Sequence, residues 1–448
     1  MAPSPGQLKK LARARMERTG ESYTTARKAI LDGRPERPSA RPARPAPAGP
    51  VPGRTSRPAA AATPAASPAQ APSASPAEDG ELPEYPAPEA VVQYDAGLWH
   101  RVLTQAGVVH PLTGEPLSEA LLAGLAGGIG FMVFVFEYEE TTTATVITRA
   151  HPEPYTQNLL ARCGAVVREQ KTGSTRLAAQ YLDAGLDEGR AVVVRVSHLA
   201  LPWVEGGIAD ADEPVDVAVL GEHEDGNLLV DDGSGGLQLI APEDLAAARA
   251  QRKAGKNWQA WIPEATGPDV ETLVAHVLEA IAQVTGRLLG TRELDGIPAH
   301  FAKNFGVAGL RTWAGRLLDT TTATGWTRIF AEPGRLAHGL EMAVQFLTDG
   351  RYGGPGGLRG LYAEFLDEAA GLPGLEALAG CSDAYRDLAA RWDELAGYID
   401  PDVDPEDRAG HFAGIARLAT RIADAEEAAA QRLARTVEGL EKSPSPRG

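Results

Sequence analysis

The chain has 448 residues, a net charge of −17 and two cysteines, so it is long enough for two or three domains but too poor in cysteine for a disulfide framework. No apolar run approaches the roughly 18 residues of a membrane span, and no apolar stretch follows the basic N-terminus as in a secretory signal, so we predict a cytoplasmic protein without membrane contact. The nine histidines are scattered and lack CxxC or HExxH neighbours, which argues against a zinc site, and we predict no cofactor.

Residues 1–33 form a basic head. Residues 1–60 hold 13 Lys or Arg against 4 Asp or Glu, whereas the rest of the chain holds 30 against 56. Apolar residues at roughly helical spacing predict two short helices, interrupted near Gly20. The head either contacts nucleic acid or a protein partner, or is a solvated basic tip without a partner. The cations available for such a contact are Lys9, Lys10, Arg13, Arg15, Arg18, Arg27 and Lys28.

Residues 34–90 predict a disordered tether. They contain 15 of the 34 prolines, with Ala and Ser between them. Such a composition cannot bury enough apolar surface to fold, and its prolines favour extended, semi-rigid chain. We therefore expect the head to be mechanically separate from the remainder of the protein.

Residues 91–264 predict a mixed domain of helices and strands. The helices expected are 97–106, 118–125, 154–162, 174–184 and 242–252, and the strands are 131–138, 144–148, 165–168, 191–197, 215–221, 227–230, 237–240 and 258–262. The DDGSGG segment at 231–236 is typical of a hairpin turn. Because the strands end in an antiparallel meander, the pattern favours an α+β fold over a doubly wound sheet.

A glycine-rich turn at 124–130 follows a helix and precedes a strand. A dinucleotide-binding fingerprint has the opposite order, strand then glycines then helix. We therefore interpret these glycines as positions of close backbone packing and positive φ.

Residues 265–441 predict an all-α helical bundle, followed by a short tail at 442–448. The long apolar-periodic segments are 270–284, 298–318, 336–347, 358–370, 383–396 and 407–440. Pro333, Pro373 and Pro401 separate several of them. The closely spaced Glu and Arg of the last segment indicate a solvated helix face.

Several motifs occur in a recognisable order. They are LSEALLAGLAGGIGFMVFVFEYE, AVVVRVSHLALPW, PVDVAVLGEHEDGNLLVDD and PEDLAAAR, followed by FAKNFGVAGLRTWAGRLLD, GPGGLRGLYAEFLDEAAGL and YRDLAARWDELA. Over residues 91–400 this order resembles the butirosin biosynthesis protein H family, with its N-terminal domain and the helical domain that follows it.

The resemblance implies a papain-like or transglutaminase-like acyltransferase fold. The family's named member moves an aminoacyl group from a carrier-protein thioester to an aminoglycoside amine. An acyl-carrier protein or a small metabolite is therefore the implied partner. The sequence does not decide whether the chain forms a homo-oligomer. The chemistry needs a Cys at a helix N-terminus, a His on a strand to activate it, and a polar group to orient that His.

This chain departs from the family pattern at two of these three roles. The family's Cys position corresponds to Gln93–Tyr94 or the adjoining Asp95, where no Cys stands. The His position corresponds to Val215 or Asp216, where no His stands. The acidic position survives as Asp231 or Asp232.

Other residues could substitute, but each has a plainer interpretation. Cys163 and Cys381 are interpreted as small buried apolar groups. His100 is expected on a helix and facing solvent, His198 where a strand leaves the sheet, and His223 on an exposed turn. Asp95 is expected to cap the first helix of the mixed domain, and Asp231–Asp232 to begin a hairpin turn without metal.

Three functions remain in competition. The first is a catalytically degenerate family member that acts as a binding or scaffold module. The second is an active acyltransferase with relocated chemistry, and the third is a docking protein that acts through the basic head. The sequence favours the first, because losing one member of a catalytic triad costs several orders of magnitude in rate.

Overall fold

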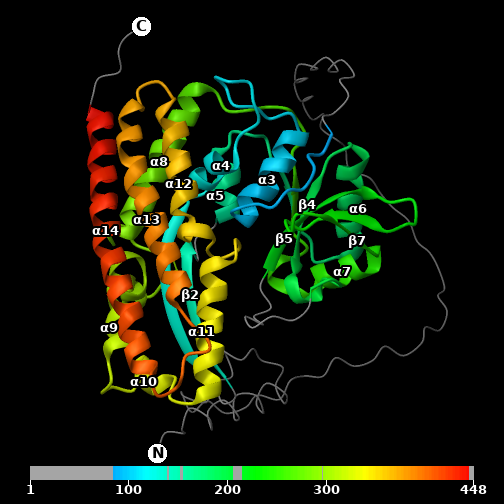
Figure 1. Cartoon of the computed structure of the whole chain (residues 1–448). Coiled ribbons are helices and arrows are strands. Elements are labelled where there is room, and N and C mark those ends of the chain that lie inside the picture. Colours follow the sequence, from blue (N-terminus) through cyan, green and yellow to red (C-terminus); the bar gives the residue numbers. More distant parts are fainter. Residues whose placement is uncertain (1–83, 139–140, 152–154, 205–213, 295, 443–448) are drawn as a thin grey trace, which may run out of the picture. The chain divides into compact units, whose positions relative to one another are not determined.

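The computed structural model describes residues 84–138, 141–151, 155–204, 214–294 and 296–442. The head, most of the tether and the tail from residue 443 lie outside this set. Contacts divide the chain into two units, Met1–Pro76 and Ala77–Gly448, and the structure below is that of the second unit (Figure 1).

The larger sheet has six strands in the order β3-β8-β4-β5-β6-β7, and neighbouring strands are antiparallel. These strands are β3 (Arg168–Gln170), β4 (Val192–Ser197), β5 (Pro214–Glu222), β6 (Leu228–Asp231), β7 (Leu237–Ile240) and β8 (Gln259–Trp261). Because side chains alternate along a strand, the Val side chains at 215, 217 and 219 share one buried face. Helices α6 (Thr175–Asp187) and α7 (Pro242–Gln251) cover that face, and α3 (Tyr94–Gln105) lies on the other (Figure 1).

A two-stranded hairpin follows α4 (Glu119–Leu125) and consists of β1 (Ile129–Glu137) and β2 (Thr142–Arg149). The glycine-rich turn before it has the predicted conformation, since Gly127 and Gly128 have φ values of 103° and 48°. Gly124 gives the close approach, because a Cβ there would lie 2.2 Å from the ring of Phe365. Helix α5 (Tyr155–Arg162) then leads to the larger sheet.

The C-terminal part is helical and packs against the β1–β2 hairpin. Its α-helices are α8 (Val270–Leu288), α9 (Gly306–Leu318), α10 (Trp326–Ile329), α11 (Pro333–Thr348), α12 (Arg359–Ala370), α13 (Ala379–Tyr398) and α14 (Arg408–Lys442). Helix α9 contacts β1 and α11 contacts β2, while α14 packs along α8, α9 and α13.

An enclosed ion pair joins the hairpin to the helices. Arg359 and Glu426 are both fully buried, and Arg359 Nε lies 2.6 Å from Glu426 Oε1. The guanidinium also donates to the backbone carbonyls of Gly130 and Thr148, both at 2.8 Å. Because these carbonyls belong to β1 and β2, one side chain anchors both strands to α12.

The α+β class with a helical C-terminal part is confirmed, and three elements differ from expectation. The helix expected over 298–318 is broken into a 3₁₀ segment (Ala299–Asn304) and α9. The break has a tertiary cause, because Phe305 is extended (φ −117°, ψ 155°) and forms a β-bridge with Met132. The strand expected at 165–168 begins at Arg168, and α10 was not expected. Among the described residues, no helix is long and apolar enough to cross a membrane.

Candidate functional site

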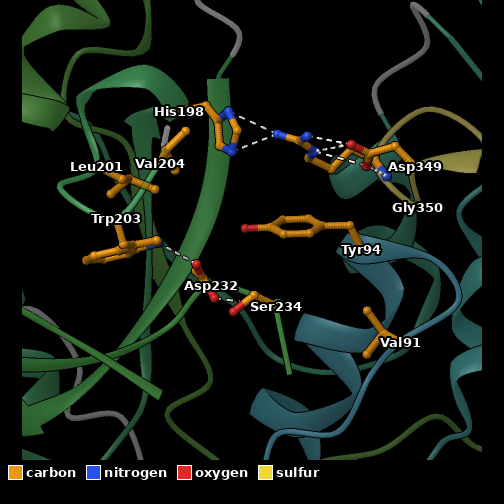
Figure 2. A pocket seen from close by; sticks show the side chains of 12 residues that line it. Val91, Tyr94, His198, Leu201, Trp203, Val204, Asp232, Ser234, Asp349 and Gly350 are labelled. Carbon is orange, nitrogen blue, oxygen red and sulfur yellow. Dashed lines mark hydrogen bonds and ion pairs between the residues drawn. The ribbon is translucent and has the colours of Figure 1, made fainter. Parts of the chain in front are cut away.

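A pocket of about 340 Å³ lies where four segments meet. These are the start of α3, the end of β4, the β6–β7 turn and the loop after α11 (Figure 2). Its polar side chains are Tyr94, His198, Asp232, Ser234, Asp349 and Arg351, and its apolar wall includes Val91, Leu201 and Trp203. The pocket therefore combines residues from the mixed domain and from the helical part.

Tyr94 occupies the first position of α3 and points into this pocket (Figure 2). Its hydroxyl donates to the backbone carbonyl of Asp216 at 2.8 Å. Its ring packs on Gly233, where a Cβ would come within 2.8 Å of it. Burial, followed by the charges of Asp232 and Asp95, raises the pKa of the phenol well above its ordinary value. Tyr94, one of the residues predicted to correspond to the family's nucleophile, is therefore a neutral, hydrogen-bonded side chain.

Asp95 does not cap α3 as expected. The cap is Gln93, whose side-chain oxygen accepts from the Ala96 N–H at 2.6 Å. Asp95 pairs instead with Arg149 of β2, at 2.5 Å. The physical reason is tertiary, because a neighbouring guanidinium offers the carboxylate a charged partner that a local cap lacks.

Val215 and Asp216, the two residues predicted to correspond to the family's His, point to opposite faces of β5. Val215 is buried in the apolar face under α6 and α7. Asp216 is on the α3 face and forms two hydrogen bonds with Arg195, at 2.6 and 2.7 Å, while Arg195 lies over the ring of Trp258. Burial raises the pKa of Asp216, and Arg195 offsets only part of that effect. Asp216, predicted to correspond to the family's base, is thus part of an ion pair with Arg195.

The two carboxylates of the β6–β7 turn have different surroundings. Asp231 is fully buried and pairs with Arg101 of α3 at 2.6 Å. Asp232 lines the pocket, accepts from Trp203 Nε1 at 2.6 Å and accepts from the Ser234 N–H at 3.0 Å. No ion pair joins Asp232 to any of the residues that the structure describes. The expected hairpin is confirmed, and it presents a carboxylate to the pocket.

His198 lies directly after β4 and contacts Arg351. Arg351 Nη1 is 2.7 Å from His198 Nε2 and 2.9 Å from Nδ1, and the same guanidinium is paired with Asp349 (Figure 2). Because a guanidinium can only donate, the imidazole nitrogen that accepts from it carries no proton. Burial and the charge of Arg351 lower the pKa of His198. Burial alone would raise the pKa of Asp349, but Arg351 outweighs it and holds that pKa low.

The other candidate side chains lie outside the pocket. His100 is half-buried, with Nδ1 at 2.7 Å from the Leu117 carbonyl, so the expectation that it faces solvent was wrong. His223 is exposed as expected and pairs with Asp225 at 3.0 Å. Cys163 and Cys381 are buried, as expected, and burial raises the pKa of the Cys163 thiol to about 11. The described residues contain no group of three His, Cys, Asp or Glu placed to hold a metal.

The sequence reasoning missed Arg351 and Asp349, which close one side of the pocket. They stand in the loop between α11 and α12, more than 100 residues beyond β7. Their only local signal is the glycine-rich stretch DGRYGGPGG at 349–357, which interrupts helical periodicity and thereby indicates irregular backbone.

Two family models match the chain. Residues 94–233 match butirosin biosynthesis protein H, N-terminal, and residues 243–433 match a domain of unknown function, DUF4872. Together these two matches support a butirosin biosynthesis protein H-like family. The two matched regions meet at the pocket, since Tyr94, His198 and Asp232 belong to the first and Arg351 to the second. A search of curated proteins finds no match.

Proposed function

We propose that this family member binds a small amine-bearing molecule in the pocket and does not carry out thiol-dependent acyl transfer. The observation that supports the proposal is the Asp232 carboxylate, which lines the pocket with hydrogen-bond donors around it but no cationic partner among the described residues. A largely buried carboxylate gains most from an ammonium group at that position.

The charges around the pocket favour a cation. Asp349 and Arg351 neutralise each other, and His198 is neutral because its pKa is lowered. Asp232 therefore leaves one negative charge at the wall. The rings of Tyr94 and Trp203 also line the pocket, and aromatic faces attract ammonium groups. The volume of about 340 Å³ is in the range of sites for small molecules.

Three features argue against acyl transfer at the family's position. Tyr94 stands at the helix N-terminus where a thiolate is needed, and its phenol is less acidic than an ordinary tyrosine. Neither Cys163 nor Cys381 lines the pocket, and both are buried. A proton acceptor is also lacking at Val215 and Asp216, because Asp216 is engaged by Arg195.

Binding is tested by calorimetry with the two-ring aminoglycoside neamine and its fully N-acetylated derivative. We expect the amine to bind and the acetylated compound to bind at least about tenfold more weakly, because acetylation removes the charge that Asp232 would meet. Asp232→Asn should cause a similar loss. Asp402→Asn, on an exposed loop, is the matched control, and equal binding of both compounds would refute the proposal.

The absence of acyl transfer is tested with acyl-carrier thioesters and amine acceptors. We expect no turnover by the wild-type protein. Turnover that disappears in Cys163→Ser or Cys381→Ser would identify a relocated nucleophile and restore the acyltransferase alternative. Turnover that survives both substitutions would indicate chemistry that does not use a thiol.

A further inference from the structure

The segment that enters the mixed domain, residues 84–93, is held at both ends and is called the strap below. Up to Val91 it contains neither helix nor strand. At its first end, Tyr85 Oη donates to Asp231 Oδ2 at 2.6 Å. Asp231 is fully buried and is also held by Arg101. A carboxylate fixed in this way is a strong and immobile acceptor for the tyrosine.

The second end is fixed by Glu119 at the start of α4. Its Oε1 accepts the backbone N–H of Val92 at 2.9 Å and that of Gln93 at 2.6 Å. The strap then passes directly into α3 through the Gln93 cap. Two acidic side chains from different elements therefore hold an otherwise irregular segment.

Between these anchors the strap forms part of the pocket wall. Val91 lines the pocket and packs so closely on Gly97 that a Cβ there would lie 2.2 Å from Val91 Cγ1. Ala90 lies beside Gly235 in the β6–β7 turn. The anchor itself belongs to the same turn, since Asp231 Oδ1 accepts the Gly233 N–H at 2.8 Å. Movement of the strap would therefore change both the wall and the turn that carries Asp232.

We propose that Tyr85 is a positioning residue that latches the strap over the pocket and thereby raises the affinity for the ligand. This inference rests on the proposed function, because it concerns ligand binding at the same pocket. Tyr85 acts through Asp231 and Val91 and needs no contact with the ligand. Residues 84–90 of the strap are also the last residues of the predicted tether, so any force or binding event that displaces Tyr85 would be transmitted to the pocket.

The test compares the full-length wild type with Tyr85→Phe, using Tyr138→Phe, on an exposed tyrosine, as the control. Hydrogen exchange without ligand should accelerate about tenfold at the Val92, Gln93 and Gly233 amides in Tyr85→Phe. The affinity for neamine should fall by about the same factor, with the melting temperature little changed. Neamine should also slow exchange at these amides in the wild type, because coupling between two sites is reciprocal.

The outcomes separate the two proposals. If Asp232→Asn abolishes neamine binding but Tyr85→Phe changes neither affinity nor exchange, the latch is refuted and the proposed function stands. If neamine does not bind the wild type, the proposed function fails, and exchange alone decides the latch: unchanged rates at Val92 and Gly233 overturn it. If Tyr85→Phe does not fold, Glu119→Gln tests the other anchor, with the same exchange pattern expected.

Discussion

Two Arg–carboxylate pairs in this protein are chemically alike but differently placed. Arg359–Glu426 in the helical part and Arg195–Asp216 beside the pocket both have contacts of 2.6 Å, and each guanidinium lies over a tryptophan ring. Arg359 is fully enclosed, whereas the Arg195 side chain is 23% exposed. The first pair also anchors two strands, while the second stands next to Tyr94, whose hydroxyl donates to the backbone carbonyl of Asp216.

The difference in exposure gives the same Arg–carboxylate interaction a different weight in the stability of the fold at the two places. When one partner of an enclosed pair is removed, the other charge cannot reach solvent and stays buried without a counter-charge. A pair at the edge of a pocket can relax toward water when one partner is lost. We therefore expect the Arg195–Asp216 pair to contribute less to the stability of the fold than the enclosed Arg359–Glu426 pair.

Glu426→Gln should produce the largest effect. The substitution leaves the guanidinium of Arg359 buried without a counter-charge, and we expect the free energy of unfolding to fall by about 3–5 kcal/mol. Urea denaturation measures this change. The neighbouring Glu427→Gln is the control, because Glu427 pairs with Arg311 at the surface and should cost less than about 1 kcal/mol. Equal losses in the two variants would show that enclosure does not make the Arg359–Glu426 pair more important for stability than a surface pair.

Asp216→Asn should destabilise the protein less, by about 2 kcal/mol. The raised pKa of Asp216 means that the fold already disfavours its ionised form, and Arg195 keeps its contact with Trp258. The same denaturation experiment applies, with the exposed Asp383→Asn as the reference. A loss as large as that of Glu426→Gln would show that the pocket pair is equally indispensable.

Tyr94→Phe should cost about 1 kcal/mol, the value of one partly buried hydrogen bond. The ring would still pack on Gly233, so only the donation to the Asp216 carbonyl is lost. Thermal unfolding against Tyr138→Phe measures the difference. An effect above about 3 kcal/mol would mean that Tyr94 has a structural role beyond that bond.

The pH dependence contributed by His198 should be the smallest effect. Its folded pKa is lowered by burial and by Arg351, while Asp349 and Asp232 act in the opposite direction. As the pH falls, His198 is therefore protonated in the unfolded state before it is protonated in the folded state, and this favours unfolding. The stability that neutral His198 contributes is fully present above a pH of about 6.5 and declines as the pH falls toward the folded pKa. His198→Asn should flatten that part of the profile. His151, with a pKa lowered to about 4, contributes in the same direction and remains in both proteins, and identical profiles would contradict the prediction.

The sequence alone determined the elements whose signals are local. The strand expected at 215–221 is β5, and the DDGSGG turn predicted the β6–β7 hairpin, because strand and turn signals lie in neighbouring residues. The motif order also singled out Tyr94 or Asp95, Val215 or Asp216, and Asp231 or Asp232. In the structure Tyr94 contacts Asp216 and lines one pocket with Asp232. The sequence likewise predicted the burial of Cys163 and Cys381.

Tertiary structure decided the remainder. Whether Asp95 caps a helix or pairs with Arg149 depends on a strand about 50 residues away, and the break at Phe305 depends on its bridge to Met132. Arg351 reaches the pocket from the helical part, and Tyr85 reaches Asp231 across 146 positions of sequence. These contacts join segments that are distant in the sequence through packing and charge. Neither the periodicity of apolar residues nor local structural propensity specifies which distant partner a side chain will contact.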